Sequence, residues 1–264
     1  MKNNVKIFYN NNDKSINTFN EVKDKLIKNG FNIVENDYNI AIAIGGDGSF
    51  LRMVKETNFK SNVLYLGINT GTLGFAQEIH VNELDELIEN LKTGNYKVNE
   101  FGVQETNLYS NNENSKFYSL NDIVIRDMDL NTLKLDIFID DALLEHFAGD
   151  GILVSTSFGS TAYNLSFGGS IIYNTFHALE LTPVAPINNK TYRTLANSLV
   201  LPQKKNIEII PVSNKNLIVT VDGENKYYEN VDKIDTILSD KTIMCYQNIN
   251  YNFVKKINDK FLSN

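Results

Sequence analysis

The stretch IAIAIGGDGS, residues 40–49, decides how the N-terminal part of the chain folds. An apolar run without polar interruption is typical of a strand in a parallel sheet, because helices cover both faces of such a sheet. The glycines that follow end the strand and allow the backbone to turn. A helix is expected next, over 49–56. The stretch therefore predicts a strand–loop–helix unit of an α/β domain.

The flanking segments repeat this alternation. Strands are predicted over 5–9 and 63–68, and helices over 15–29 and 81–91. Each helix is followed by a glycine suited to its C-terminal end, Gly30 and Gly94. Residues 1–100 are thus expected to form an α/β domain with a parallel sheet, and a helix within residues 253–264 is expected to pack back on it.

From about residue 101 the pattern changes to short stretches of alternating apolar and polar residues, separated by turn clusters such as 111–114 and Asp222-Gly223. Strands are predicted at 105–109, 116–126, 132–139, 142–147, 207–211 and 217–221. Strands at this spacing are typical of antiparallel sheets. Residues 101–252 are therefore expected to form an all-β, sandwich-like domain.

Composition narrows the possible functions. The 264 residues carry a net charge of -7, which is unfavourable for binding nucleic acid because phosphates are neutralised by clustered Lys and Arg. No apolar run approaches the roughly 20 residues that span a membrane. The single cysteine, Cys245, cannot form an internal disulfide and lies in an apolar stretch, so a buried thiol and a cytoplasmic location are expected.

The loop at 45–49 has the residues for phosphate chemistry. Gly45, Gly46 and Gly48 allow the backbone to approach a ligand, and the helix start at Ser49 offers free N–H groups to an anion. Asp47 among them is unexpected in a loop that only binds phosphate, since two anions repel. It would instead accept a proton from an attacking hydroxyl, or hold Mg²⁺ between phosphates. The alternative is that Asp47 caps the helix.

Two further loops follow predicted strands. The glycine-rich loop 67–75 is either a ligand-binding edge of the sheet or a crossover in which Leu73 and Phe75 pack. In the run 149–166, a strand at 152–155 leads into a loop of Ser, Thr and Gly that suits a ribose or pyrophosphate. Asp150 would accept bonds from ribose hydroxyls and Tyr163 would lie against a ring; the alternative is a helix cap with Tyr163 in the core.

These segments, in this order, resemble the NAD kinase family. The match rests on Gly45 to Gly48, the loop 67–75, the pair Asn121-Asp122, Gly149 to Gly151, and the run 159–163. The resemblance implies transfer of a phosphoryl group from ATP or polyphosphate to the 2′-hydroxyl of the adenosine ribose of NAD, giving NADP. It also implies Mg²⁺ or another divalent cation with ATP, and a homodimer or homotetramer whose NAD site borrows residues from a neighbour.

The resemblance assigns roles to single residues. Asp47 would accept the proton of the 2′-hydroxyl, Gly48 would lie against the NAD, and Arg52 would reach phosphate oxygens. Asn121 and Asp122 would bind the adenine end, although Asp122 is one methylene shorter than the glutamate usual there. The remaining substrate-binding positions are Asp150, Thr161, Ala162, Tyr163, Asn164, Ser166, Ala185 and Asp222. No metal ligand is predicted, since His80, His146 and His177 lack metal-ligand spacing.

Two other functions stay open from the sequence. A lipid or sugar-phosphate kinase would share the loop around Asp47, but a lipid kinase should carry a membrane-facing amphipathic helix, which the sequence does not indicate. A catalytically silent NAD-binding sensor would bind the dinucleotide without forming NADP.

Overall fold

The computed structural model describes residues 3–71, 74–111 and 113–263. Its contacts divide the chain into two units, Met1–Glu100 with Thr242–Asn264, and Phe101–Lys241. Two strands belong partly to each unit, β6 (Lys97–Ser110) and β17 (Val231–Gln247). The return to the first unit therefore begins at Thr242, earlier than the expected residue 253, because the end of β17 pairs with the first unit's sheet.

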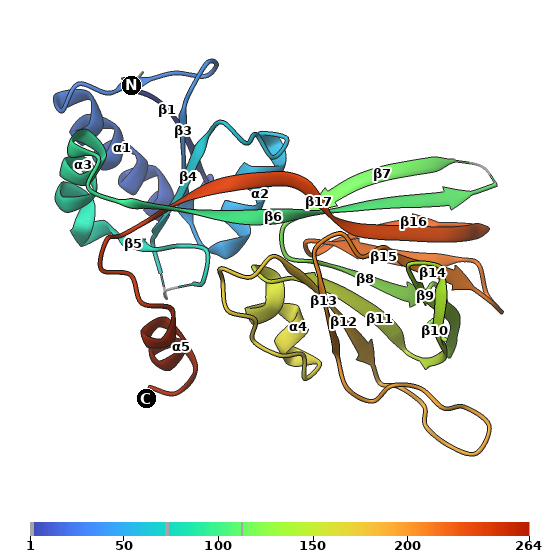
Figure 1. The fold of residues 1–264 in the computed structure, drawn as a ribbon. Helices are drawn as coiled ribbons and strands as arrows, with labels where there is room; N and C mark the ends of the chain where they lie inside the picture. Colours follow the sequence, from blue (N-terminus) through green and yellow to red (C-terminus); the bar gives the residue numbers. More distant parts are fainter. Residues whose placement is uncertain (1–2, 72–73, 112, 264) are drawn as a thin grey trace. The chain divides into compact units, whose positions relative to one another are not determined.

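The predicted parallel sheet of the first unit is confirmed, and its strand order is β2-β1-β3-β4 (Figure 1). Its strands are β1 (Asn4–Tyr9), β2 (Asn32–Ile33), β3 (Ile40–Gly45), β4 (Leu64–Asn69) and the short β5 (Ile79–His80). Every residue of β3 and β4 is buried, which explains the unbroken apolar sequence of β3 and of β4 up to Ile68. Met244 and Cys245 of β17 extend this sheet by pairing in parallel with β4.

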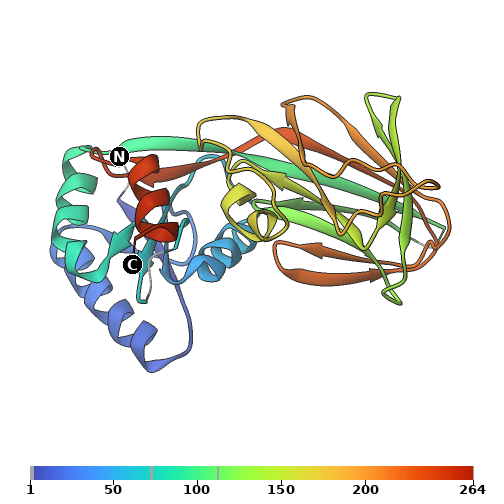
Figure 2. The ribbon, with the colours of Figure 1, turned by 90° about the horizontal axis from the view of Figure 1, so that it is seen from below.

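The helices of this unit are α1 (Asp13–Lys28), α2 (Asp47–Glu56), the 3₁₀ turn η1 (Val81–Glu83) with α3 (Leu84–Thr93), and α5 (Phe253–Phe261). Figures 1 and 2 show α1 and α3 on one face and α2 on the other. Leu26 of α1 and Leu87 of α3 pack with Ile42 and Leu66 of the sheet in one core. Gly30 and Gly94 have the positive φ expected after a helix.

The second unit contains two groups of β-strands. One is an antiparallel sheet in the order β13-β12-β11-β8-β15-β16. Its strands are β8 (Asp122–Asp127), β11 (Gly151–Thr156), β12 (Ala178–Val184), β13 (Leu199–Pro202), β15 (Leu217–Val221) and β16 (Glu224–Tyr228). The other group contains β7 (Asn114–Ser119), β9 (Leu133–Ile139), β10 (Ala142–Gly149), β14 (Ile207–Pro211), and parts of β6 and β17.

One apolar core joins the two groups of strands. Ile125 and Val219 come from the first, and Ile137, Phe147 and Ile209 from the second; all five are almost completely buried. The expected sandwich-like, antiparallel domain is confirmed. The predicted strand 116–126 is wrong, because the chain forms two strands there, β7 and β8, with a break at Leu120 and Asn121. Of the predicted turn 111–114, Asn112 lies outside the described residues, and Asn114 already belongs to β7.

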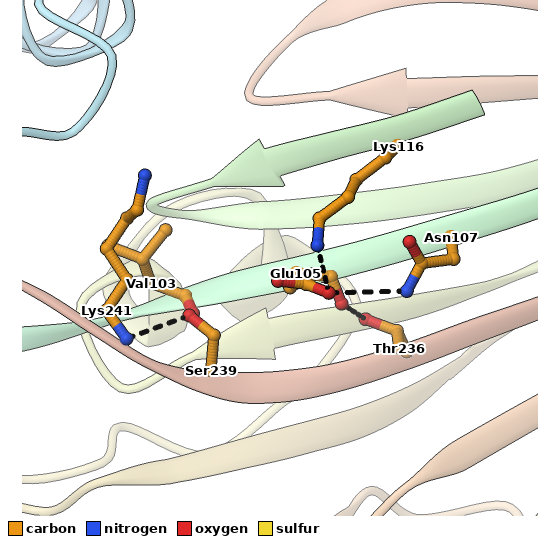
Figure 3. A network of polar contacts seen from close by, with 7 residues as sticks. All are labelled: Val103, Glu105, Asn107, Lys116, Thr236, Ser239 and Lys241. Atoms are coloured by element: carbon orange, nitrogen blue, oxygen red, sulfur yellow. Dashed lines mark hydrogen bonds and ion pairs between the residues drawn. The ribbon is translucent and has the colours of Figure 1, made fainter.

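Polar side chains connect β6, β7 and β17 inside the second unit (Figure 3). Thr236 of β17 donates a hydrogen bond to the carbonyl of Glu105 at 3.2 Å, and Ser239 donates one to the carbonyl of Val103 at 2.7 Å. Lys116 of β7 forms an ion pair with Glu105 at 2.6 Å. Because buried polar groups need partners, these bonds fix which residues of the three strands face one another.

Candidate functional site

The loop 45–49 turns the chain from β3 into α2. Gly45 has a φ of 148°, a conformation that favours glycine, and a Cβ there would overlap Ser49. Ser49 is buried and accepts a hydrogen bond from the Asn10 amide at 3.0 Å. Gly46 is the N-cap of α2, and no atom lies within 4 Å of the position that a Cβ would take at Gly48. The loop therefore presents bare backbone next to Asp47.

Asp47 is the first residue of α2, so this helix begins two residues before the predicted Ser49. No side chain caps the helix, and the alternative that Asp47 is its cap is wrong. Its carboxylate instead accepts two backbone hydrogen bonds, from Phe75 N–H to Oδ2 at 2.9 Å and from Ala76 N–H to Oδ1 at 3.1 Å. A Cβ at Gly74 would overlap the carboxylate, so the chain can approach it closely only because residue 74 is glycine.

The loops that follow β3 and β4 are linked by further contacts. Gln77, completely buried, donates from Nε2 to the carbonyl of Gly46 at 2.7 Å, and a Cβ at Gly67 would overlap this glutamine. Both loops lie at the carboxyl ends of parallel strands, the usual position of ligand sites in such sheets. Phe75 packs against α5, which agrees with the crossover interpretation, while Thr72 and Leu73 lie outside the described residues.

Arg52 lies one turn further along α2 and is exposed. Its guanidinium donates to Asn10 Oδ1 at 2.9 Å and lies 3.6 Å from Glu56. Asn10 is the residue that also bonds Ser49. Arg52 is thus connected to the loop 45–49 through Asn10, and sequence reasoning did not single out that asparagine.

In the second unit, Asp222 holds the residues between β7 and β8. Asp222 lies in the hairpin turn between β15 and β16 with a φ of 47°. Its carboxylate accepts backbone hydrogen bonds from Leu120 at 2.9 Å, Asn121 at 2.7 Å and Asp122 at 3.2 Å. The structure therefore brings three sequence-predicted residues together, and within this contact Asp222 orients the backbone of Asn121 and Asp122.

Asp122 is a buried acid, 3% exposed. Burial, and to a smaller extent the negative charge of Asp222, raise the pKa of its carboxyl to about 7. The Asn121 carbonyl accepts a hydrogen bond from Thr156 N–H at 2.8 Å. A Cβ at Gly159 would overlap that same carbonyl. The Asn121-Asp122 pair thus contacts the start of the run 159–163.

That run forms a 3₁₀ turn, η2 (Gly159–Thr161), and one helical turn, α4 (Tyr163–Ser166). Asn164 is completely buried. It donates to Glu180 Oε2 at 2.8 Å and accepts from Thr182 Oγ1 at 2.6 Å, which connects α4 to β12. This asparagine does not present its side chain to solvent, and it supports the turn from beneath.

Tyr163 is 42% exposed, so the alternative of a core aromatic is wrong. Its hydroxyl accepts a hydrogen bond from Arg126 of β8 at 2.7 Å, and its ring meets Phe167 edge-on at 4.6 Å. Thr161 and Ala162 are half-buried beside it, and Ser166 is exposed. Arg126 was not predicted, because nothing in its own segment sets it apart from other strand residues.

Asp150 and Ala185 lie close together at one end of the antiparallel sheet. Asp150 is exposed in the turn between β10 and β11, and its N–H donates to the carbonyl of Val184 at 3.0 Å. Ala185, the next residue, has a φ of 46°. A Cβ at Gly149 would meet the Ala185 carbonyl at 2.9 Å, so this glycine allows the two segments to approach.

Comparison with known proteins identifies the family. A family model of the ATP-NAD kinase N-terminal domain matches residues 2–96, and one of the ATP-NAD kinase C-terminal domain matches residues 120–245. The chain is 43% identical to an NAD kinase of Finegoldia magna, over 98% of this chain and 97% of that protein. The chain belongs to the NAD kinase family. The resemblance drawn from the sequence is confirmed, and with it the predicted kinase activity.

Other members of the NAD kinase family are similar over much of their length. An NAD kinase 2 of Halalkalibacterium halodurans is 32% identical, with 99% of both chains covered. Among solved structures, yeast NADH kinase complexed with NADH superposes with a TM-score of 0.85 at 24% identity, covering 99% of this chain and 88% of that one. An Archaeoglobus fulgidus NAD kinase in complex with ATP gives 0.72 at 20% identity, covering 93% and 94%. Both structures share the fold of this NAD kinase family member.

Two negative findings apply to the described part of this NAD kinase family chain. Within residues 3–71, 74–111 and 113–263, no three Asp, Glu, His or Cys side chains gather as a metal site would require. Across the same ranges, no helix is both long and apolar enough to cross a membrane.

Cys245 is buried and burial raises the pKa of its thiol well above the usual value, in line with the expected structural role.

Proposed function

We propose that the chain transfers the terminal phosphoryl group of ATP, or of polyphosphate, to the 2′-hydroxyl of the adenosine ribose of NAD, with Asp47 as the general base. The observation that carries the proposal is the environment of the Asp47 carboxylate. Two backbone amides orient it, one on each oxygen, at the carboxyl end of a parallel strand. A carboxylate offers about four lone-pair sites, so two remain to accept a proton.

The reaction proceeds by one displacement. The 2′-oxygen forms a bond to the γ-phosphorus as the bond from that phosphorus to the bridging oxygen breaks, and ADP leaves. The hydroxyl proton goes to a carboxylate oxygen of Asp47. Phosphoryl transfer depends mainly on positioning and on electrostatic stabilisation, so a side chain held by fixed backbone donors suits this role. The bare backbone of Gly46 and Gly48, at the start of α2, suits contact with phosphate oxygens.

A divalent cation bound with ATP would neutralise developing charge on the transferred phosphoryl group. Mg²⁺ is commonly held by one or two carboxylates together with the phosphates of the substrate, so it needs no cage of protein ligands. The phosphates of the donor would hold such a cation, which leaves the Asp47 carboxylate to accept the proton. We propose Mg²⁺ as the cation on that basis.

We also propose that the second unit binds NAD through two kinds of residue. One group would contact the dinucleotide directly: Asn121, Asp122, Asp150, Thr161, Ala162, Tyr163, Ser166 and Ala185. Asn164 and Asp222 would act from behind, since their side chains bond to other parts of the protein. Arg52 would contact phosphate oxygens, its exposed guanidinium being reachable from solvent. We also propose that the chain assembles as a homodimer or homotetramer and acts in the cytoplasm.

The proposal is tested by the formation of NADP. The purified chain is incubated with NAD and, in parallel, ATP, other nucleoside triphosphates and polyphosphate, each with Mg²⁺ and with a chelator. NADP formed with at least one donor supports the proposal, and sedimentation reports the assembly. NAD bound calorimetrically without any NADP formed would indicate a silent sensor, and phosphorylation of diacylglycerol in place of NAD would indicate a lipid kinase.

A further inference from the structure

The C-terminal helix α5 contacts the segment that holds Asp47. Lys256 of α5 is 8% exposed, and its Nζ donates a hydrogen bond to the carbonyl oxygen of Phe75 at 2.7 Å. The ring of Phe75 stacks on Phe261, with centroids 5.3 Å apart, and meets Phe253 edge-on at 6.5 Å. Residues of α5 thus hold both the backbone and the ring of Phe75, whose N–H donates to Asp47.

One peptide plane connects Lys256 to Asp47. The peptide between Phe75 and Ala76 is planar and trans, so its carbonyl and its N–H point in opposite directions. The carbonyl accepts the hydrogen bond from Lys256, and the N–H donates to Oδ1 of Asp47 at 3.1 Å. Rotating this plane would break both bonds together. The position of Lys256 therefore determines where one of the two amide donors points.

The charge of Lys256 acts in the same direction. A cation on the carbonyl polarises the peptide and strengthens its N–H as a donor. The nearest carboxylate, Glu78, is 3.8 Å away, and burial lowers the pKa of the ammonium while the charges of Glu78 and Asp47 oppose this. The ion pair with Glu78 offsets part of the cost of burying this charge. The hydrogen bond of the ammonium, at 2.7 Å, goes instead to the Phe75 carbonyl, the other end of the peptide whose N–H bonds Asp47.

We propose that Lys256 is a positioning residue for phosphoryl transfer: by holding the Phe75–Ala76 peptide it fixes the Asp47 carboxylate in its reactive orientation. The inference rests on the proposed function, since it assigns Asp47 the role of base. Lys256 acts through this peptide and needs no contact with NAD or ATP.

The first test replaces Lys256 by Met in the full chain. We expect kcat to fall by about 10- to 100-fold, the scale on which misplacement of a reacting group acts. The KM for NAD and the calorimetric NAD affinity should stay at the wild-type values. Lys255→Met removes the same charge from the neighbouring, exposed position of α5 and should leave kcat unchanged. A Lys256→Met enzyme with normal kcat would overturn the inference.

The second test is a double-mutant cycle with Asp47→Asn. If Lys256 acts through Asp47, then Lys256→Met has no further effect on the residual kcat of Asp47→Asn. If the fold losses in kcat of the two single variants multiply in the double variant, Lys256 has an independent, structural role and the inference is overturned. If Lys256→Met alone does not fold, the cycle is run in a Glu78→Gln background. The variant Glu78→Gln/Lys256→Met, which lacks both buried charges, is then compared with Glu78→Gln. A wild-type chain that forms no NADP would contradict the proposed function itself, a result distinct from either outcome.

Discussion

The carboxylate of Asp222 accepts a hydrogen bond of 2.7 Å from the backbone N–H of Asn121, although the two residues are 101 positions apart in the sequence. The same carboxylate accepts bonds from Leu120 and Asp122. The turn between β15 and β16 thus supplies the hydrogen-bond acceptor for the residues between β7 and β8. This one side chain fixes three consecutive backbone N–H groups, including those of the Asn121-Asp122 pair.

Replacing Asp222 by Ala should leave these three N–H groups without their acceptor. We expect the free energy of unfolding to fall by about 1–3 kcal/mol and NAD to bind more weakly, since unpaired donors are costly and the pair loses its anchor. Urea unfolding and calorimetry measure the two effects. Asp141→Ala is the matched control, because Asp141 is an exposed hairpin residue whose φ is 66°. Equal losses in both variants would mean that backbone strain alone accounts for the effect.

Replacing Asp47 by Asn should remove the proton acceptor while keeping the shape of the side chain. We expect turnover to fall by at least roughly 10²-fold, the usual contribution of a general base, while NAD still binds. NADP formation at saturating substrates and calorimetry provide the two measurements. Asp24→Asn, at an exposed position of α1, should behave as wild type. Turnover near normal in Asp47→Asn would show that the carboxylate has only a structural role.

Replacing Tyr163 by Ala should weaken NAD binding and leave turnover at saturating NAD close to normal, since the ring supplies contact area and no reacting group. Tyr163→Phe separates the ring from the hydroxyl that accepts the Arg126 hydrogen bond. Tyr227→Ala removes a tyrosine that is 64% exposed on β16 and serves as control. A large loss of kcat with NAD affinity intact would contradict this role.

The buried carboxyl of Asp122 predicts a pH dependence of stability. Because its pKa is raised to about 7 in the folded chain, the folded state holds this proton where the unfolded state has released it. The contribution of Asp122 to stability should therefore be fully present below the unfolded pKa of roughly 4 and decline as the pH rises to about 7, by at most about 1.4 kcal/mol per pH unit.

Asp122→Asn removes this titration. Urea unfolding of both proteins between pH 4.5 and 7.5 should show the variant gaining stability over the wild type as the pH rises. Glu78, whose pKa burial also raises to about 7, titrates in both proteins and cancels in the difference. A difference that stays constant with pH would contradict the assignment.

The sequence predicts the elements that follow simple periodicity. The apolar strand at 40–44 and the amphipathic α1 are found where their patterns place them, because each buries a regular face. The strand β12 was not predicted, since all its residues are buried and Glu180 interrupts its apolar pattern. The buried carboxylate of Glu180 is explained by the hydrogen bonds that it accepts from Asn164 and Ser170.

The candidate site could be predicted less completely than the fold. Local sequence identified Asp47 and its glycines, but not the residues that orient it. Phe75 and Ala76 are 28 and 29 positions away, and Lys256 lies near the other end of the chain. Such contacts depend on how strands and loops meet in three dimensions, and they carry no local signature. For the same reason Asp222 was predicted near the site but not as an anchor.

The pairing of Met244 and Cys245 with Leu64 and Tyr65 has a consequence for biosynthesis. Domains usually fold in order as the ribosome delivers them, the N-terminal one first. Here the ribosome has to supply residues up to 245 before β4 obtains this neighbour, and up to 256 before Lys256 can reach Phe75. The nascent N-terminal segment emerges with that strand edge uncovered, so its maturation waits until these later residues have been translated.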